Sequence, residues 1–262
     1  NANFAALDSN NRTPLDYFKL SIIESFIPLN SCKDKDRMIK LLKPISRIHQ
    51  PHLPLSQIEI KREGYYIHYD TRTKVASYAY QRLTKSCFEK NAHRKGLSFK
   101  VDNQIPKENR AKHADYTHSG FQKGHLVPAA DAVSSEKAMS DTFYFSNAFP
   151  QNPNCNQGYW KLVENYVREL VNDNDVVEVF TGPLFIPERK RVSYETIGSG
   201  NISVPTHVFK VIFLHNRSTT SQAFILPNSS ISSEIELEKF QARIEEVQEL
   251  SGILFSHWRS KN

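Results

Sequence analysis

Cysteine is scarce in this sequence and never closely spaced. The three cysteines of the 262-residue chain, Cys32, Cys87 and Cys155, lie far apart and form no Cys-x-x-Cys motif. This spacing excludes the usual zinc-finger and thioredoxin-like sites and a disulfide-framework fold, and it allows one intrachain disulfide at most. No internal repeat or low-complexity segment is apparent.

Long hydrophobic runs are also absent. No stretch approaches the roughly 18 apolar residues that a membrane span needs, so we expect no membrane segment in this chain. Residues 1–13 have neither a basic start nor an apolar core, which predicts that any targeting segment is absent from this chain. With 39% hydrophobic and 24% charged residues, the composition is typical of a soluble globular protein.

Positive charge is concentrated in one segment. Residues 82–125 contain ten Lys or Arg residues and four Asp or Glu residues, a net charge of +6, whereas the rest of the chain has 24 of each sign. Such a segment, in a chain with a pI of about 9.1, suits the binding of a polyanion, because each neutralised phosphate releases counterions. A solvated, lysine-rich loop is the alternative that charge alone leaves open.

The hydrophobic pattern predicts an α+β domain with a mainly antiparallel sheet, preceded by an extension. Residues 14–27 have apolar positions at helical spacing, which predicts an amphipathic helix. Prolines and histidines interrupt regular structure over 44–54, so we expect 1–55 to form an N-terminal helical extension and 56–262 the main domain. The elements expected there are a hairpin of strands at 64–69 and 75–80, strands at 124–127, 142–146, 176–180, 203–213 and 222–226, a helix starting after Asn156, and a final helix at 233–250.

The residues that could carry chemistry gather in two motifs. The first places His125 after a glycine and beside Lys123, and a histidine that titrates near neutral pH can act as a general base. The second begins at Asn156 and continues into a helix that carries Glu164 and Arg168. An amide oxygen suits Mg²⁺, which keeps several waters. Spacings of eight and four residues would keep the three helical residues on one broad face.

Each of these residues also has a purely structural explanation. Glu164 and Arg168 form an i,i+4 pair in the favoured order, which is often only a surface salt bridge. Asn156 could cap a helix, and His125 could be a satisfied structural histidine. Their combination beside the basic segment favours a functional site. That hypothesis requires His125 and Asn156 to face one solvent-accessible place.

At these motifs the sequence resembles the DNA/RNA non-specific endonucleases of the ββα-metal (His-Me finger) class, which include mitochondrial endonuclease G and an exonuclease-like mitochondrial relative. Gln122-Lys-Gly-His125 resembles the family's Asp-Arg-Gly-His motif, and Asn156-Gln-Gly-Tyr-Trp160 resembles its Asn-x-Gly-x-Trp helix. Further similar segments follow in the family's order over roughly residues 60–255. The resemblance implies a ββα-metal nuclease fold, in which helices flank a central, mainly antiparallel sheet.

The resemblance also implies a role for each matching residue. His125 would be the general base. Asn156 would be the single direct protein ligand of Mg²⁺, for which Mn²⁺ could substitute, and Glu164 would orient metal-bound water. Arg168 and Arg94 would neutralise charge on the scissile phosphate. The remaining residues expected to bind nucleic acid are Lys123, Asn147, Lys95 and Gln122.

The implied activity is hydrolysis of phosphodiester bonds in DNA and RNA, single- or double-stranded, to leave 5′-phosphate and 3′-hydroxyl ends. The enzyme would cut internally and could also trim from 5′ ends. It could form a homodimer, and it would act in mitochondria or after export.

Two departures from the family motif leave an alternative open. Gln122 and Lys123 stand where the family has Asp and Arg. Lysine keeps the charge but loses the bidentate fork, and glutamine removes a carboxylate. Because neither change removes the base or the metal ligand, we expect an active enzyme. A nucleic-acid-binding pseudoenzyme of the same fold is the alternative, and a structural or dimerisation module that uses the helix at 14–27 is a third hypothesis.

Overall fold

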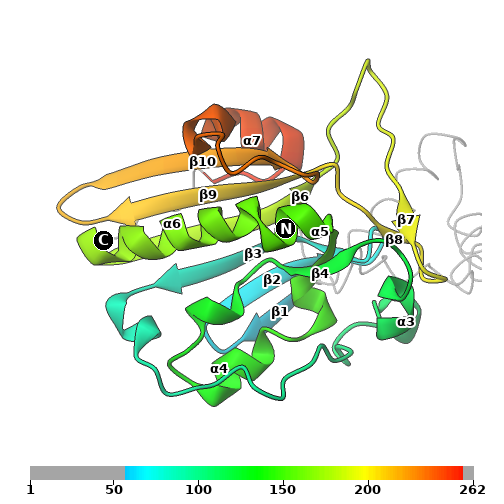
Figure 1. Ribbon diagram of the computed structural model, residues 1–262, viewed down its shortest axis with the longest axis horizontal. Helices are drawn as coiled ribbons and strands as arrows, with labels where there is room; N and C mark the ends of the chain where they lie inside the picture. Colours follow the sequence, from blue (N-terminus) through cyan, green and yellow to red (C-terminus); the bar gives the residue numbers. More distant parts are fainter. Residues whose placement is uncertain (1–56, 256–262) are drawn as a thin grey trace, which may run out of the picture. The chain divides into compact units, whose positions relative to one another are not determined.

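A seven-stranded sheet forms the centre of the part of the protein that the structure describes. The computed structural model describes residues 57–255, and its main sheet has the strand order β1-β2-β3-β6-β9-β10-β11 (Figure 1). These strands are β1 (Gln57–Arg62), β2 (Tyr65–Asp70), β3 (Val75–Leu83), β6 (Val176–Leu184), β9 (His207–His215), β10 (Thr219–Pro227) and β11 (Gln241–Ala242). Every neighbouring pair is antiparallel, so the expected α+β class is confirmed.

The predicted hairpin is present as β2 and β3. The two strands pair across a turn at 71–74, in which Lys74 has a φ of 59°. The pattern did not reveal β1, which pairs with β2 at the edge of the sheet. The apolar alternation of β1 is limited to Ile58 and Ile60, of which only Ile60 is buried, and this is shorter than the alternation by which a strand is recognised.

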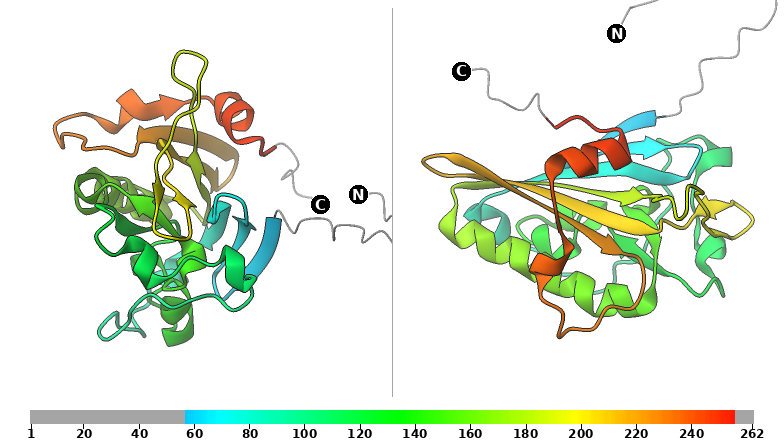
Figure 2. Two further views of the ribbon diagram at one scale, coloured as in Figure 1. Left: turned by 90° about the vertical axis from the view of Figure 1, so that its right-hand side faces the viewer. Right: turned by 90° about the horizontal axis from the view of Figure 1, so that it is seen from above.

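Helices cover both faces of the main sheet. Helix α6 (Tyr159–Asp173) lies on one face and α7 (Ile244–Ser251) on the other (Figures 1 and 2). The apolar positions of α6, among them Val163 and Val167, are buried in the larger core cluster, and Val247 of α7 is buried in a second cluster. Full burial of each such side chain stabilises the fold by about 1.5–3 kcal/mol.

A separate two-stranded sheet consists of β4 (Gln122–His125) and β5 (Ala148–Gln151), which pair in antiparallel fashion. The strand expected at 124–127 corresponds to β4, displaced by two residues. The strand expected at 142–146 is wrong, because a 3₁₀ turn, η5 (Phe145–Asn147), follows there and pairing begins only at Ala148. Phe143 and Phe145 of this segment are buried, and a short apolar run does not by itself distinguish a strand from a turn or helix.

Two helices replace the single helix expected after Asn156. The short α5 (Pro153–Gln157) contains Asn156 and begins earlier than expected, because the Asn152 side chain caps it and a proline occupies its first turn. Gly158 separates α5 from α6. A Cβ at Gly158 would lie 2.6 Å from the carbonyl oxygen of Asn154, so this junction requires glycine.

The break at Gly158 corrects one step of the sequence argument. Asn156 lies in α5, whereas Glu164 and Arg168 lie in α6. The three residues therefore do not share one continuous helical face, and helical periodicity cannot be the reason that they meet.

The final helix is much shorter than the expected 233–250. Only α7 is helical, and it is preceded by a 3₁₀ turn, η6 (Leu237–Phe240), and by β11. Strand β11 pairs with Ala223 and Phe224 of β10. Pairing with the edge of the sheet therefore overrides the local helical periodicity of this segment.

The other elements are short. They are η2 (Lys85–Phe88), η3 (Lys107–Asn109), α3 (His113–Tyr116), η4 (Ala129–Asp131), α4 (Glu136–Asp141), β7 (Thr196–Ile197) and β8 (Ile202–Ser203). Within residues 57–255, no helix is long and apolar enough to cross a membrane. The helix expected at 14–27 and the helical extension at 1–55 lie outside the described residues.

Candidate active site

A cavity of about 600 Å³ lies where the end of β4 meets α5 and α6. It is lined by Arg94, Gln122, Lys123, His125, Pro128, Ala129, Ala130, Asn156, Gln157, Lys161, Glu164 and Arg168. Seven of the nine predicted site residues are in this lining, and Lys95 and Asn147 are not. The two residues on which the hypothesis depends, His125 and Asn156, thus face one cavity.

His125 is the last residue of β4 and is half-buried in the cavity wall. Its ring packs against Phe99 and Phe143, with ring centroids 4.7 and 5.1 Å away. Burial, with a smaller contribution from the charge of Arg94, lowers the pKa of His125 to about 3. The imidazole is therefore neutral at pH 7, which is the protonation state that a general base requires.

Gln122 holds the side chain of Asn156 in place. The Asn156 Nδ2 donates a hydrogen bond of 2.7 Å to Oε1 of Gln122, at the other end of β4 from His125. This bond uses the amide nitrogen of Asn156 and leaves its Oδ1 as the atom that can bind a cation. Gln122 thus supplies the acceptor at the position where the family motif has an acidic residue.

The donor set suits one hydrated hard cation. Among the described residues, no three His, Cys, Asp or Glu side chains are placed to share a metal, so a centre built from many such ligands is not formed by this part of the chain. Asn156 offers one amide oxygen, and Glu164 offers a carboxylate in the same cavity. Mg²⁺ keeps several of its waters and takes few protein ligands, so these residues fit it.

Glu164 is the carboxylate of the cavity. Burial raises the pKa of the Glu164 carboxyl to about 7, and the nearby charge of Lys210 acts against that rise. The group is therefore close to half-ionised at neutral pH. A cation bound in the cavity would favour its charged form.

Arg168 is held in place by Asp131, an acidic residue that the sequence analysis did not single out. Its Nη1 lies 2.8 Å from Oδ1 of Asp131, whose Oδ2 accepts a 2.9 Å hydrogen bond from Nε2 of Gln81. Asn165 accepts a second bond from the Arg168 guanidinium. Asp131 follows the His125 motif by six residues, but nothing in that spacing indicates that it meets α6.

A fully buried lysine lies beneath the same helix. Lys210 of β9 is 1% exposed; its Nζ donates a 2.9 Å hydrogen bond to Oγ1 of Thr181 and lies 4.8 Å from the ring centroid of Trp160. Burial lowers the pKa of Lys210 to about 8, and the charges of Glu164 and Asp131 act against that shift. A lone lysine within an apolar strand was the available signal, because lysine is almost never fully buried unless it is paired.

Three further cations line the cavity beside Arg168. They are Arg94, Lys123 and Lys161. Lys161 was not predicted, although it lies three residues before Glu164 and so shares its side of α6. Lys95 is exposed but is not among the lining residues.

Asn147 does not have the direct role expected of it. The side chain is fully buried, and it bonds both the N–H and the carbonyl oxygen of Val127 as well as the carbonyl oxygen of Thr142. All of its polar atoms are thus used inside the protein, so the prediction that Asn147 contacts nucleic acid is corrected. Its hydrogen bonds fix the backbone at Val127, two residues after His125.

Comparison with known families identifies the protein's class. Residues 46–261 match the family described as DNA/RNA non-specific endonuclease. The chain belongs to this family. The resemblance drawn from the two motifs is therefore confirmed, and the protein is a nuclease.

Curated relatives agree with this assignment. Human mitochondrial endonuclease G is 38% identical over 208 residues, which are 77% of this chain and 70% of the relative. Human mitochondrial nuclease EXOG is 38% identical over 197 residues, 71% of this chain and 54% of the relative. Nuclease C1 of Cunninghamella echinulata var. echinulata is 38% identical over 206 residues, 75% of this chain and 81% of the relative.

A solved structure supports the fold. The crystal structure of an EndoG/EndoGI complex contains a chain that is similar to this one, with a TM-score of 0.74 and 32% sequence identity, over 75% of this chain and 84% of that chain. The ββα-metal nuclease fold is thereby confirmed. In this endonuclease-family chain, β4, β5 and α5 carry His125 and Asn156 to the same cavity.

Proposed function

We propose that this nuclease is a Mg²⁺-dependent phosphodiesterase that cuts DNA and RNA with little sequence preference and leaves 5′-phosphate and 3′-hydroxyl ends. The observation that carries the proposal is the shared cavity of a neutral histidine, His125, and an amide-oxygen ligand, Asn156. A water placed between them would be next to both a proton acceptor and a cation site.

His125 accepts the proton of the attacking water in this proposal. Its lowered pKa keeps the ring unprotonated across the neutral range, and the Phe99 and Phe143 rings restrict its orientation. The proton leaves oxygen as the oxygen attacks phosphorus, in line with the departing 3′-oxygen.

Asn156 would hold the metal ion through Oδ1, with its orientation set by Gln122. When bound, Mg²⁺ supplies Lewis-acid stabilisation of the leaving 3′-oxygen. Glu164 would accept hydrogen bonds from water around that ion. Mn²⁺ has similar ligand preferences and could substitute.

The cavity cations would bind the scissile phosphate. Arg94, Lys123 and Arg168 surround the space next to His125, and preorganised cations stabilise charge that develops in a transition state. Because phosphate contacts carry no sequence information, this arrangement accepts DNA and RNA alike. Gln122 and the exposed Lys95 remain proposed contacts to flanking nucleotides.

Two broader properties belong to the same proposal. The relatives are named mitochondrial, which supports a mitochondrial site of action. We also propose that the protein is a homodimer. Multi-angle light scattering of the purified chain would test this by measuring its mass in solution.

The decisive experiment uses supercoiled plasmid and single-stranded RNA, with Mg²⁺ or with EDTA. We expect the wild-type chain to degrade both substrates only with Mg²⁺, and His125→Ala to lower the rate by at least a hundredfold while its circular dichroism is unchanged. His207→Ala is the matched control, because His207 does not line the cavity. Full activity of His125→Ala would refute the mechanism, and binding without cutting by the wild type would favour the pseudoenzyme.

A further inference from the structure

The contact behind Arg168 has a consequence for substrate binding. Asp131 does not line the cavity, although its neighbours Ala129 and Ala130 do. Its side chain is 2% exposed, whereas that of Arg168 is 22% exposed. The carboxylate thus sits behind the cavity wall, and the guanidinium lies between that carboxylate and the cavity.

The carboxylate is held in position independently of Arg168. Gln81 of β3 donates to Oδ2 of Asp131, and Arg168 donates to Oδ1. Because Gln81 is itself only 3% exposed in the main sheet, the sheet fixes Asp131 and Asp131 in turn fixes Arg168. Asp131 and Asn165 use two of the five N–H groups of this guanidinium, and Arg168 lines the cavity.

Acidic groups oppose the positive charge under this wall. Asp131 and Glu164 both interact electrostatically with Arg168 and Lys210, and Asp131 contacts the Arg168 guanidinium directly. An arginine in such a setting presents less positive field to a polyanion than an isolated arginine would.

We propose that Asp131 is a positioning residue for Arg168 that both orients the guanidinium at the cavity wall and offsets its charge, and so limits how tightly the site holds nucleic acid. This inference rests on the proposed function, in which Arg168 meets the scissile phosphate. A site that turns over must release a polyanionic product, and an uncompensated cation at its wall would retain that product.

The neighbouring Gln81 makes it possible to remove the charge of Asp131 while its hydrogen bonds are kept. The Oε1 of Gln81 is buried and lacks a hydrogen-bond partner within the described residues. In Asp131→Asn, the new amide oxygen can still accept from Arg168, and rotation of the Gln81 amide lets Oε1 accept from the new amide nitrogen. Asn therefore keeps both contacts and removes the charge, whereas Asp131→Leu removes both.

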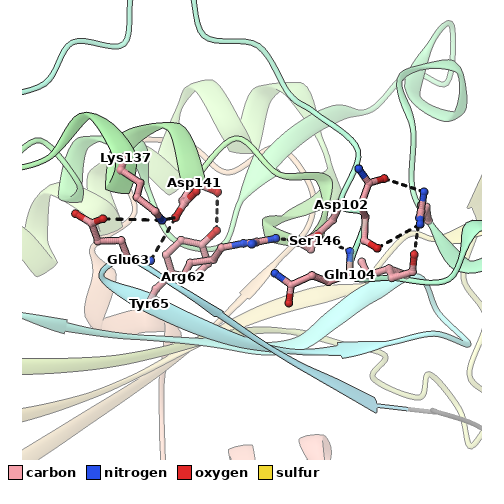
Figure 3. Close-up of polar contacts among 11 residues, drawn as sticks. Arg62, Glu63, Tyr65, Asp102, Gln104, Lys137, Asp141 and Ser146 are labelled. Atoms are coloured by element: carbon pink, nitrogen blue, oxygen red, sulfur yellow. Dashed lines mark hydrogen bonds and ion pairs between the residues drawn. The ribbon is translucent and has the colours of Figure 1, made fainter.

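A second buried ion pair provides the matched control. The Arg62 Nη2 lies 2.6 Å from Oδ2 of Asp102, with side chains 10% and 1% exposed, and Ser146 also bonds this carboxylate (Figure 3). Neither Arg62 nor Asp102 lines the cavity. Asp102→Asn thus perturbs a comparable buried pair at a place that the proposal does not involve.

The test measures binding without turnover. Fluorescence anisotropy with a labelled 12-nucleotide single-stranded DNA in EDTA would compare His125→Ala with His125→Ala/Asp131→Asn and His125→Ala/Asp102→Asn between 50 and 300 mM salt. We expect Asp131→Asn to tighten binding about three- to tenfold at low salt and to steepen the slope of log K against log salt by about 0.7 to 1. The His125→Ala/Asp102→Asn variant should match His125→Ala in both binding affinity and salt slope.

Kinetics of the otherwise wild-type enzyme then test positioning. With Mg²⁺ and an oligonucleotide substrate, we expect Asp131→Asn to lower KM and, through slower product release, to lower kcat by no more than about threefold. We expect Asp131→Leu to lower kcat about tenfold or more. An unchanged salt slope or weaker binding in the Asp131→Asn double variant would overturn the inference even if the wild type cuts normally. If the wild type does not cut and His125→Ala does not bind, the proposed function itself has failed and the inference fails with it.

Discussion

At the scale of single residues, the site depends on how buried polar groups are satisfied. Asn156 is oriented by Gln122, and Arg168 by Asp131. The sequence indicates which residue types could bind a cation or a phosphate. It does not indicate their hydrogen-bond partners, because Gln122 and Asn156 are 34 residues apart and meet only after folding.

The Gln122 contact predicts a dependence on metal concentration. In Gln122→Ala the Asn156 amide loses its acceptor, and we expect the Mg²⁺ concentration for half-maximal cleavage to rise about tenfold, in the range found for residues that orient metal ligands. Gln122→Glu keeps an acceptor and should need no more Mg²⁺ than the wild type. Calorimetric Mg²⁺ titration provides a readout apart from activity, and equal Mg²⁺ affinities in all three proteins would contradict the prediction.

The lowered pKa of His125 predicts a pH-dependent loss of stability. Its pKa is about 3 in the folded protein and about 6.5 in an unfolded chain. The unfolded state alone therefore binds this proton between those values, so the contribution to stability is present above about pH 6.5 and is lost as the pH falls.

Urea unfolding in EDTA measures this effect. Between pH 7 and pH 5 the wild type should lose about 1–2 kcal/mol more free energy of unfolding than His125→Gln. Parallel losses in the two proteins would show that His125 is not held neutral by the fold.

At the scale of secondary-structure elements, the junction of α5 and α6 determines where the metal ligand lies. Periodicity predicted a helix here and correctly placed Val163 and Val167 in the core. It did not predict the break at Gly158, because that break follows from the close approach of the Asn154 carbonyl oxygen.

Gly158→Ala tests the role of this junction. A Cβ would have to displace the Asn154 carbonyl oxygen, which lies 2.6 Å from its position, and α5 would shift with Asn156. We expect Mg²⁺-dependent cleavage to fall about tenfold or more and the free energy of unfolding to fall by about 1–3 kcal/mol. Asn154→Ala, which keeps the carbonyl group, is the control and should retain activity; an active Gly158→Ala enzyme would show that the junction is not critical.

At the scale of the whole molecule, charge is the most informative property of the sequence. The basic segment at 82–125 supplies Arg94 and Lys123 to the cavity, and α6 adds Lys161 and Arg168. Of the compensating acids, Glu164 lies in α6 itself and Asp131 lies in η4, outside both the basic segment and the helix, so the net field at the site depends on the fold.

The positive field of the cavity predicts that DNA binding depends measurably on salt concentration. Removing one phosphate-binding cation should reduce the slope of log binding constant against log salt by about 1, so Lys123→Ala in a His125→Ala background should bind DNA with a flatter slope. Lys61→Ala removes an exposed lysine of β1 that does not line the cavity, and it should leave the slope unchanged. Identical slopes for both variants would exclude Lys123 as a phosphate contact.

Local sequence patterns were enough to predict the class of the fold, the family and most of the chemistry. The β2–β3 hairpin, the apolar positions of α6 and the two motifs around His125 and Asn156 are local patterns, and backbone geometry makes such patterns readable without the rest of the chain.

The contacts that hold each polar side chain became known from the three-dimensional fold alone. The burial of Asn147, the pairing of β11 with β10, and the contacts of Asp131 and Lys210 all arise between segments far apart in the sequence. A buried polar group must find a partner wherever the fold supplies one, and the distance along the chain carries no information about which partner that will be.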